Sequence, residues 1–153
     1  MSQSSLPSQK PKEDALALFL DRLHQALTTE SVGRQQQWME AVGDALARLE
    51  GALRQHQAAA WHPDGPLAEI DQTRPTLARQ TDELRSDYDD YLQQLLTLRE
   101  QVRRTAQAGP SDGVDLAALR QQAEQFLAGL QKKWETETKL LLESVNTDIG
   151  AGD

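Results

Sequence analysis

The chain has 153 residues and a formal net charge of −8, from 24 acidic and 16 basic residues. This length is enough to bury one core, and the acidic balance argues against a nucleic-acid surface and against electrostatic docking to anionic lipid. The absence of cysteine excludes disulfides, thiolate catalysis and thiolate metal sites. No segment approaches the roughly 20 apolar residues of a membrane span, and residues 1–12 lack the apolar region of a signal peptide. The sequence therefore predicts a cytoplasmic protein with no membrane or nucleic-acid partner.

Apolar residues recur at three- and four-residue spacing along four segments, which is typical of amphipathic helices. Residues 1–12 are polar and contain two prolines, so they are expected to form a disordered tail. The first helix is predicted over residues 13–29 and the second over residues 34–60. The loop that follows contains Pro63, Gly65 and Pro66, which cannot continue a helix.

Residues 67–72 are expected to add a short helical piece before the third long helix. That helix is predicted from Pro75 to about residue 107, with Tyr88 and Tyr91 in its inward stripe. After a turn at 109–113, the fourth helix is predicted over residues 114–145, and residues 146–153 are expected to leave it. The folded domain is placed at residues 13–148, followed by a flexible end at 149–153.

Four amphipathic helices joined by short turns pack most simply as an antiparallel, up-down-up-down four-helix bundle. No strand-like alternation occurs anywhere in the chain. The sequence therefore predicts an all-α protein with a single helical domain.

Four polar side chains interrupt the inward stripes of the predicted helices: His56, Tyr88, Lys133 and Glu137. Burying a polar group is unfavourable unless it is paired, so these residues indicate a site or the remains of one. Tyr88 lies about 20 residues before the 109–113 turn and Lys133 about 20 residues after it, which places the two at the same level in antiparallel helices. Glu137 lies one turn beyond Lys133 on the same face.

Several stretches resemble bacterial hemerythrin-like (HHE cation-binding) domains. They are residues 19–24 (Phe-Leu-Asp-Arg-Leu-His), Gly33 and Arg34 with Trp38, residues 53–56 (Leu-Arg-Gln-His), and the ending at 140–150. The resemblance covers nearly the whole chain after the tail. It implies an antiparallel four-helix bundle and a non-haem di-iron centre held by inward histidine and carboxylate side chains.

The ligand set that the resemblance implies is incomplete in this chain. The family's ligand positions fall on His56 and Ala60 in the second helix, Asp87 and Tyr88 in the third, and Lys133 and Glu137 in the fourth. A protonated ammonium cannot ligate a metal, and its charge repels a cation. His56 and Glu137 remain beside a phenol, so we expect no conventional metal site and no cofactor.

Two interpretations of the polar layer remain open. One is a satisfied polar core, in which Lys133 pairs with Glu137 and Tyr88 bonds His56. The other is a modified metal pocket that retains non-haem iron. His24 occupies a place similar to the family's first-helix histidine, but counting around the 30–33 turn separates it from the level of His56 by about 24 Å. The two histidines are therefore not expected to share a ligand.

Other conspicuous residues have ordinary explanations as well as functional ones. His62 lies in the Pro/Gly loop and is expected to be exposed. Trp61 and Trp134 are expected to cap the bundle, the alternative being apolar contact with a partner. Three aspartates around Tyr88 are expected to form a hydrated face, the alternative being weak divalent-cation binding: Asp87, Asp89 and Asp90.

Catalytic motifs are missing from the sequence. There is no recognisable Ser/His/Asp arrangement, no phosphate-binding loop and no His-Glu-x-x-His motif, so we expect a protein that is not an enzyme. The favoured interpretation is a hemerythrin-like protein that has lost its di-iron site and has a structural or regulatory role through contact with an unidentified protein partner. The alternative is a non-haem metal-binding protein of oxygen, redox or iron handling with a reduced ligand set.

Overall fold

A computed structural model describes residues 10–31, 33–109 and 113–152, with side chains for 15–31, 33–109 and 116–146. The described chain is all-helical and contains no strand, which confirms the predicted class. The helices are α1 (Lys10–Thr28), α2 (Gln35–Ala60), α3 (Pro66–Thr73), α4 (Pro75–Ala108) and α5 (Gly113–Gly152). None of them is both long and apolar enough to cross a membrane.

The helix boundaries differ from the prediction at the two ends of the chain. α1 begins at Lys10, so the assignment of residues 10–12 to a tail was wrong, whereas residues 1–9 lie outside the described part. Pro11 fits within a first turn because its missing N–H has no partner there. α5 continues to Gly152, so the predicted departure at residue 146 was also wrong. Glycine at position 150 weakens a helix but does not block it.

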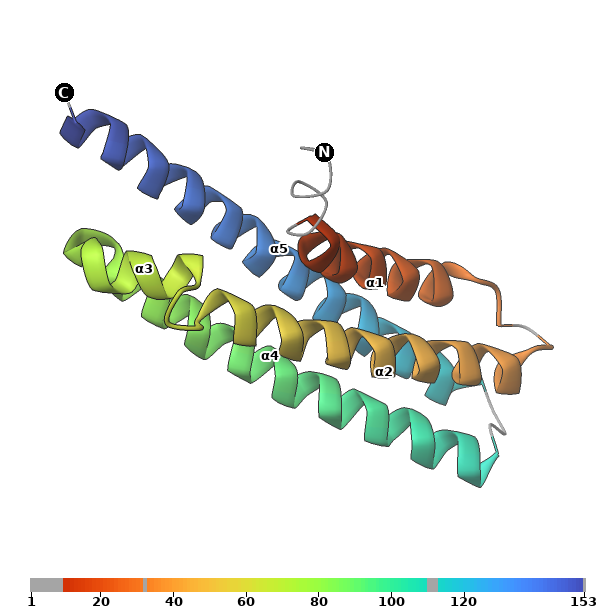
Figure 1. Ribbon diagram of the computed structural model, residues 1–153. Coiled ribbons are helices and arrows are strands. Elements are labelled where there is room, and N and C mark those ends of the chain that lie inside the picture. The colour runs from red at the N-terminus through yellow and green to blue at the C-terminus, as the bar shows by residue number, and fades with distance from the viewer. Residues whose placement is uncertain (1–9, 32, 110–112, 153) are drawn as a thin grey trace.

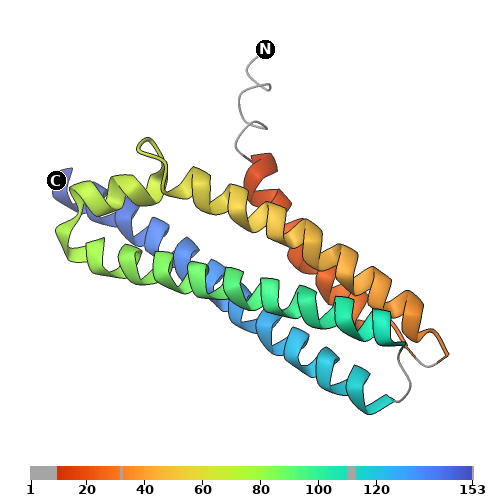
Figure 2. The same ribbon diagram turned by 90° about the horizontal axis from the view of Figure 1, so that it is seen from below.

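The long helices lie side by side, and successive ones run in alternating directions (Figures 1 and 2). α1 and α4 run one way, and α2 and α5 run the other. α1 packs against α2 and α5, and α4 packs against α2, α5 and the short α3. At 1.5 Å per residue α5 is about 60 Å long and α1 only about 28 Å, so α5 extends well past the start of α1.

A continuous apolar core runs between the helices along the predicted stripes. Its fully buried members include Leu16, Leu23, Leu46, Leu49, Leu53, Leu95 and Leu130. One position of the α4 stripe was assigned wrongly. Leu92 is buried, whereas Tyr91 is half-buried and lies against Gly129 of α5. The spacing of the apolar residues therefore predicted the buried face of α4 to within one residue.

The turn between α2 and α3 depends on one glycine. A Cβ atom on Gly65 would lie 2.2 Å from the carbonyl oxygen of Ala59 and 2.6 Å from that of Ala60, which no side chain tolerates. Pro66 then occupies the first turn of α3, where its ring favours helix initiation. This tight reversal holds Trp61 at the end of α2 against the core.

Candidate functional site

Glu137 of α5 is the centre of a buried hydrogen-bonded cluster, with only 4% of its surface exposed. The hydroxyl of Tyr88 on α4 donates to Glu137 Oε1 at 2.7 Å. The Nε2 atom of His56 on α2 lies 2.7 Å from Oε1 and 3.0 Å from Oε2 of the same carboxylate. One carboxylate therefore joins three helices, through residues 49 and 81 positions away in the chain. We call His56, Tyr88 and Glu137 the polar cluster.

The structure brings together three of the four residues predicted for the inward layer. Lys133 is the exception, because its side chain is 32% exposed and its ammonium lies 2.8 Å from Asp87. The expected pairing of Lys133 with Glu137 was therefore wrong. The expected bond between Tyr88 and His56 was also wrong, since these rings meet edge to face with centroids 5.8 Å apart. Both side chains bind Glu137 instead, because a carboxylate is a stronger acceptor than either ring.

Tyr88 is fully buried and is held on two sides by other rings. Trp61 meets it edge to face, with centroids 5.9 Å apart, as His56 does with centroids 5.8 Å apart. Burial raises the pKa of Tyr88 above its ordinary value, and the charge and hydrogen bond of Glu137 raise it further. The phenol therefore keeps its proton and acts as a fixed donor to Glu137. The sequence did not indicate the ring contact between Trp61 and Tyr88.

Charged residues lie at the rim of the cluster and pair with one another. The hydrogen bond to Asp87 raises the pKa of Lys133 against the opposing effect of burial. Asp89 accepts a hydrogen bond from Gln57 Nε2 at 2.9 Å, while Asp90 is exposed. The three aspartates therefore serve different neighbours and do not converge on one point. The prediction that Lys133 lies level with Tyr88 was correct. The same residue count places Asp87, next to Tyr88, within reach of Lys133.

The remaining predicted residues are not members of the polar cluster. His62 is exposed, as expected, and its Nδ1 accepts a hydrogen bond from the backbone N–H of Asp64 at 3.1 Å. Trp134 is partly buried and packs against the core, as expected. His24 is exposed on α1, beside a surface hollow that it shares with Gln131 and Trp134 of α5.

The donors around Glu137 do not fit a di-iron centre. The Tyr88 hydroxyl donates to Glu137 Oε1, and His56 Nε2 lies within hydrogen-bond distance of both oxygens of the same carboxylate, so the polar atoms of the cluster pair with one another. Ala60, one turn beyond His56 on α2, is buried and offers no ligand. In the part of the chain that the structure describes, no group of three or more His, Asp or Glu residues could hold a metal ion. The arrangement joins three helices through one carboxylate and holds the phenol in place.

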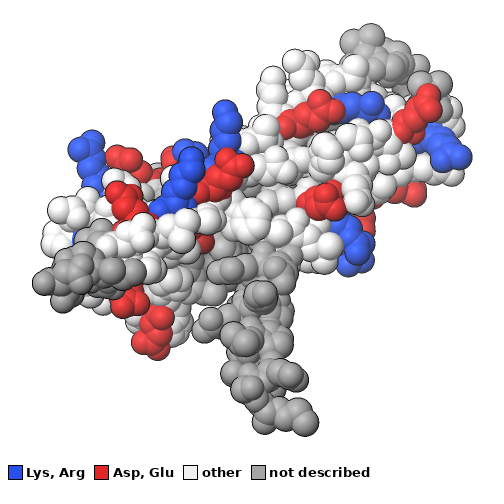
Figure 3. All heavy atoms as spheres, turned by 90° about the horizontal axis from the view of Figure 1, so that it is seen from above, with Lys and Arg blue, Asp and Glu red and all other residues white. Residues whose placement is uncertain are grey.

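Surface charge is mixed on the face seen in Figure 3, where basic side chains lie among acidic ones and form no continuous patch. Glu50 on α2 illustrates the pairing between helices. Burial alone would raise the pKa of Glu50, but hydrogen bonds from Arg54 and Arg99 lower it below its ordinary value. Other ion pairs join residues three or four apart on one helix, such as Arg79 and Glu83.

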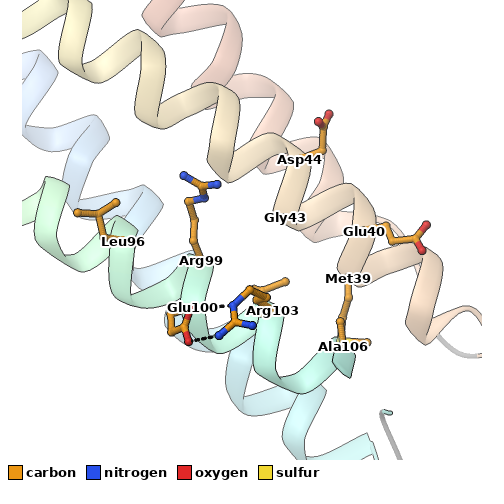
Figure 4. A pocket seen from close by; sticks show the side chains of 10 residues that line it. Met39, Glu40, Gly43, Asp44, Leu96, Arg99, Glu100, Arg103 and Ala106 are labelled. Atoms are coloured by element: carbon orange, nitrogen blue, oxygen red, sulfur yellow. Dashed lines mark hydrogen bonds and ion pairs between the residues drawn. The ribbon is translucent and has the colours of Figure 1, made fainter. Parts of the chain in front are cut away.

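A groove of about 510 Å³ lies between α2 and α4 (Figure 4). Its floor is apolar and is formed by Met39, Gly43, Leu96, Val102 and Ala106. Arginine and acidic side chains line the rim, and most of them pair within the chain, as Arg103 does with Glu100 and Asp44 with Arg48. The groove lies toward the start of α2, with Asp44 12 residues or about 18 Å before His56, so it is separate from the polar cluster.

Comparisons of the chain with protein-family models, with curated proteins and with solved structures gave no match. The hemerythrin-like resemblance rests on the residues of the chain itself.

Proposed function

We propose that the protein is a hemerythrin-like, up-down-up-down four-helix bundle formed by α1, α2, α4 and α5. In this proposal the family's metal position has become a closed polar core, and the protein has a structural or regulatory role through contact with other proteins. The observation that carries the proposal is the carboxylate of Glu137, which binds Tyr88 and His56.

The pairing of Glu137 with other side chains supports the loss of the metal. A carboxylate or imidazole ligates a metal through a lone pair, and the ligating atom cannot at the same time carry a proton. Here the Tyr88 hydroxyl donates to Oε1 of Glu137, and His56 Nε2 lies within hydrogen-bond distance of both oxygens of that carboxylate. The ammonium of Lys133, at another family ligand position, pairs with Asp87.

Two surface features support an interaction role. The groove between α2 and α4 has an apolar floor with charged walls, which is the usual composition of a protein-contact surface. The end of α5 exposes Leu142 and Val145, at 60% and 55% of their surface. Neither feature involves the polar cluster, so we assign the cluster to stability and the surfaces to recognition.

Metal analysis of protein produced with added iron and purified without chelator tests the proposal, together with an optical spectrum. We expect no stoichiometric metal in the natural sequence. The matched control is the triple variant Ala60→Glu, Tyr88→His, Lys133→His, which restores the family's ligand types at these positions. We expect this variant to take up iron if the bundle is hemerythrin-like.

Iron at about two atoms per chain in the natural sequence, with oxo-bridge absorption, would overturn the proposal. That outcome would establish the alternative of a non-haem iron protein of oxygen, redox or iron handling. A triple variant that folds but takes up no iron would contradict the hemerythrin-like assignment.

A further inference from the structure

α5 carries a second row of residues beside the one that lines the core. The row proceeds in alternating steps of four and three, a spacing that keeps residues on one side of a helix. Its members are Gln131, Glu135, Thr138, Leu142 and Val145. The first two line a hollow together with Ala17, Leu20, Asp21 and His24 of α1, so this side of α5 faces α1.

The later part of the row has no helix against it among the described residues. α5 extends beyond the N-terminal end of α1, toward the end where α3 lies (Figure 1). Leu142 is 60% exposed and Val145 is 55% exposed, whereas Leu140, on another side of the same turns, is 2% exposed. Two apolar side chains one turn apart are therefore exposed on the side of α5 that, earlier in the helix, faces α1.

We propose that this segment, the α5 stripe from Thr138 to Val145, pairs with the α5 stripe of a second copy of the chain. The stripe continues the side of α5 that, one turn earlier, lines the hollow shared with α1. A two-fold axis places the same surface of both copies in contact, with Leu142 of one copy near Val145 of the other. The inference goes beyond the proposed function and does not depend on the absence of metal.

Charge supports a second copy as the occupant. The chain has a net charge of −8, which opposes self-association over most of its surface. Residues 138–146 contain only Lys139 and Glu143 as charged side chains, so this segment has no net charge. Two copies can therefore approach through the α5 stripe without the repulsion that their other faces impose.

The contact between two α5 stripes is small, so the dimer should be weak. A helix pair of two to three turns buries less than the roughly 1,200 Å² of a standard stable interface. We therefore expect a reversible dimer that forms with rising concentration, with an association midpoint between about 1 µM and about 1 mM.

Sedimentation velocity across that concentration range tests the proposal on the full chain. We expect the natural sequence to shift from monomer to dimer, and Leu142→Glu to remain monomeric with an unchanged helical circular dichroism signal. Leu18→Glu is the matched control, because Leu18 is 45% exposed on α1 and lies outside the α5 stripe. This control should dimerise like the natural sequence.

Cysteine cross-linking provides a second measurement that does not weaken the contact with a charge. The chain has no cysteine, so a single introduced thiol can form a disulfide only with another copy. Under mild oxidation we expect Leu142→Cys to cross-link at least tenfold more than Leu18→Cys at equal concentration. The proposal is overturned if the natural sequence stays monomeric at every concentration. In that case another protein or another segment of the chain would be the partner of the α5 stripe. Equal cross-linking at both positions, or equal dissociation by both glutamate variants, also overturns the proposal.

Discussion

Lys133 and Asp87 form an ion pair across α4 and α5, with 2.8 Å between the ammonium nitrogen and a carboxylate oxygen. This pair lies at the rim of the polar cluster and leaves Glu137, one turn further along α5, to Tyr88 and His56. The structure thus separates two kinds of polar contact at one level of the molecule. The outer pair is partly hydrated, and the inner cluster is buried.

Replacing Tyr88 by phenylalanine removes a donor from a buried carboxylate while keeping the ring. We expect Tyr88→Phe to lower the free energy of unfolding by about 1–3 kcal/mol, because Glu137 would lose a hydrogen bond that water cannot replace. Chemical denaturation measures the effect. Tyr91→Phe is the control, since Tyr91 is only half-buried, and it should change stability by less than about 0.5 kcal/mol. Equal losses in both variants would contradict the role assigned to Tyr88.

Truncating Glu137 should lower the free energy of unfolding more than truncating Lys133. Glu137→Ala leaves His56 and Tyr88 buried without their acceptor, so we expect a loss of about 3–5 kcal/mol in unfolding free energy. Lys133→Met breaks a partly exposed pair and should change it by no more than about 1 kcal/mol. Urea unfolding of both variants checks the order. A larger effect from Lys133→Met would show that Lys133 supports Glu137 directly.

Alkaline pH should weaken the fold through Tyr88. Its pKa is raised in the folded state, so in the unfolded chain the phenol ionises first, near pH 10. The contribution of Tyr88 is therefore complete below about pH 10 and declines above it by about 1.4 kcal/mol per pH unit. Urea midpoints measured between about pH 8 and pH 11, with tyrosinate absorbance, test this. Tyr88→Phe should show a shallower decline, and an identical decline would contradict the assignment.

Replacing glycine by alanine should change the free energy of unfolding in opposite directions at two helical positions. A Cβ atom on Gly129 would lie 2.2 Å from the Tyr91 hydroxyl oxygen, so Gly129→Ala must displace that ring. We expect a net loss of unfolding free energy, because overpacking of about 1–3 kcal/mol exceeds the helix-propensity gain of about 0.5–1 kcal/mol. Gly51→Ala meets open space and should gain about 0.5–1 kcal/mol from helix propensity. Thermal and chemical unfolding of the two variants give the signs, and a gain at Gly129 would show that Tyr91 moves freely.

The helical class and most helix boundaries followed from the sequence because each long helix must bury one apolar stripe. The 3.6-residue repeat places Leu49, Leu53 and His56 on one side of α2 regardless of what packs there. The ends of the chain were less predictable, because no proline or tight turn marks where α5 stops. Periodicity also left a choice between neighbours such as Tyr91 and Leu92, since both lie near the edge of the stripe.

By itself the sequence determined that His56, Tyr88 and Glu137 lie inward and that Tyr88 and Lys133 share a level, because both follow from the rise and period of a helix. Only the tertiary structure decided which groups pair. Lys133 lies seven residues from both Phe126 and Leu140, which are buried, but its long, flexible side chain carries the ammonium out to the rim beside Asp87. Tyr88 and His56 both bind Glu137 because three helices bring these side chains together. The spacing of residues within one helix cannot predict such a contact between helices.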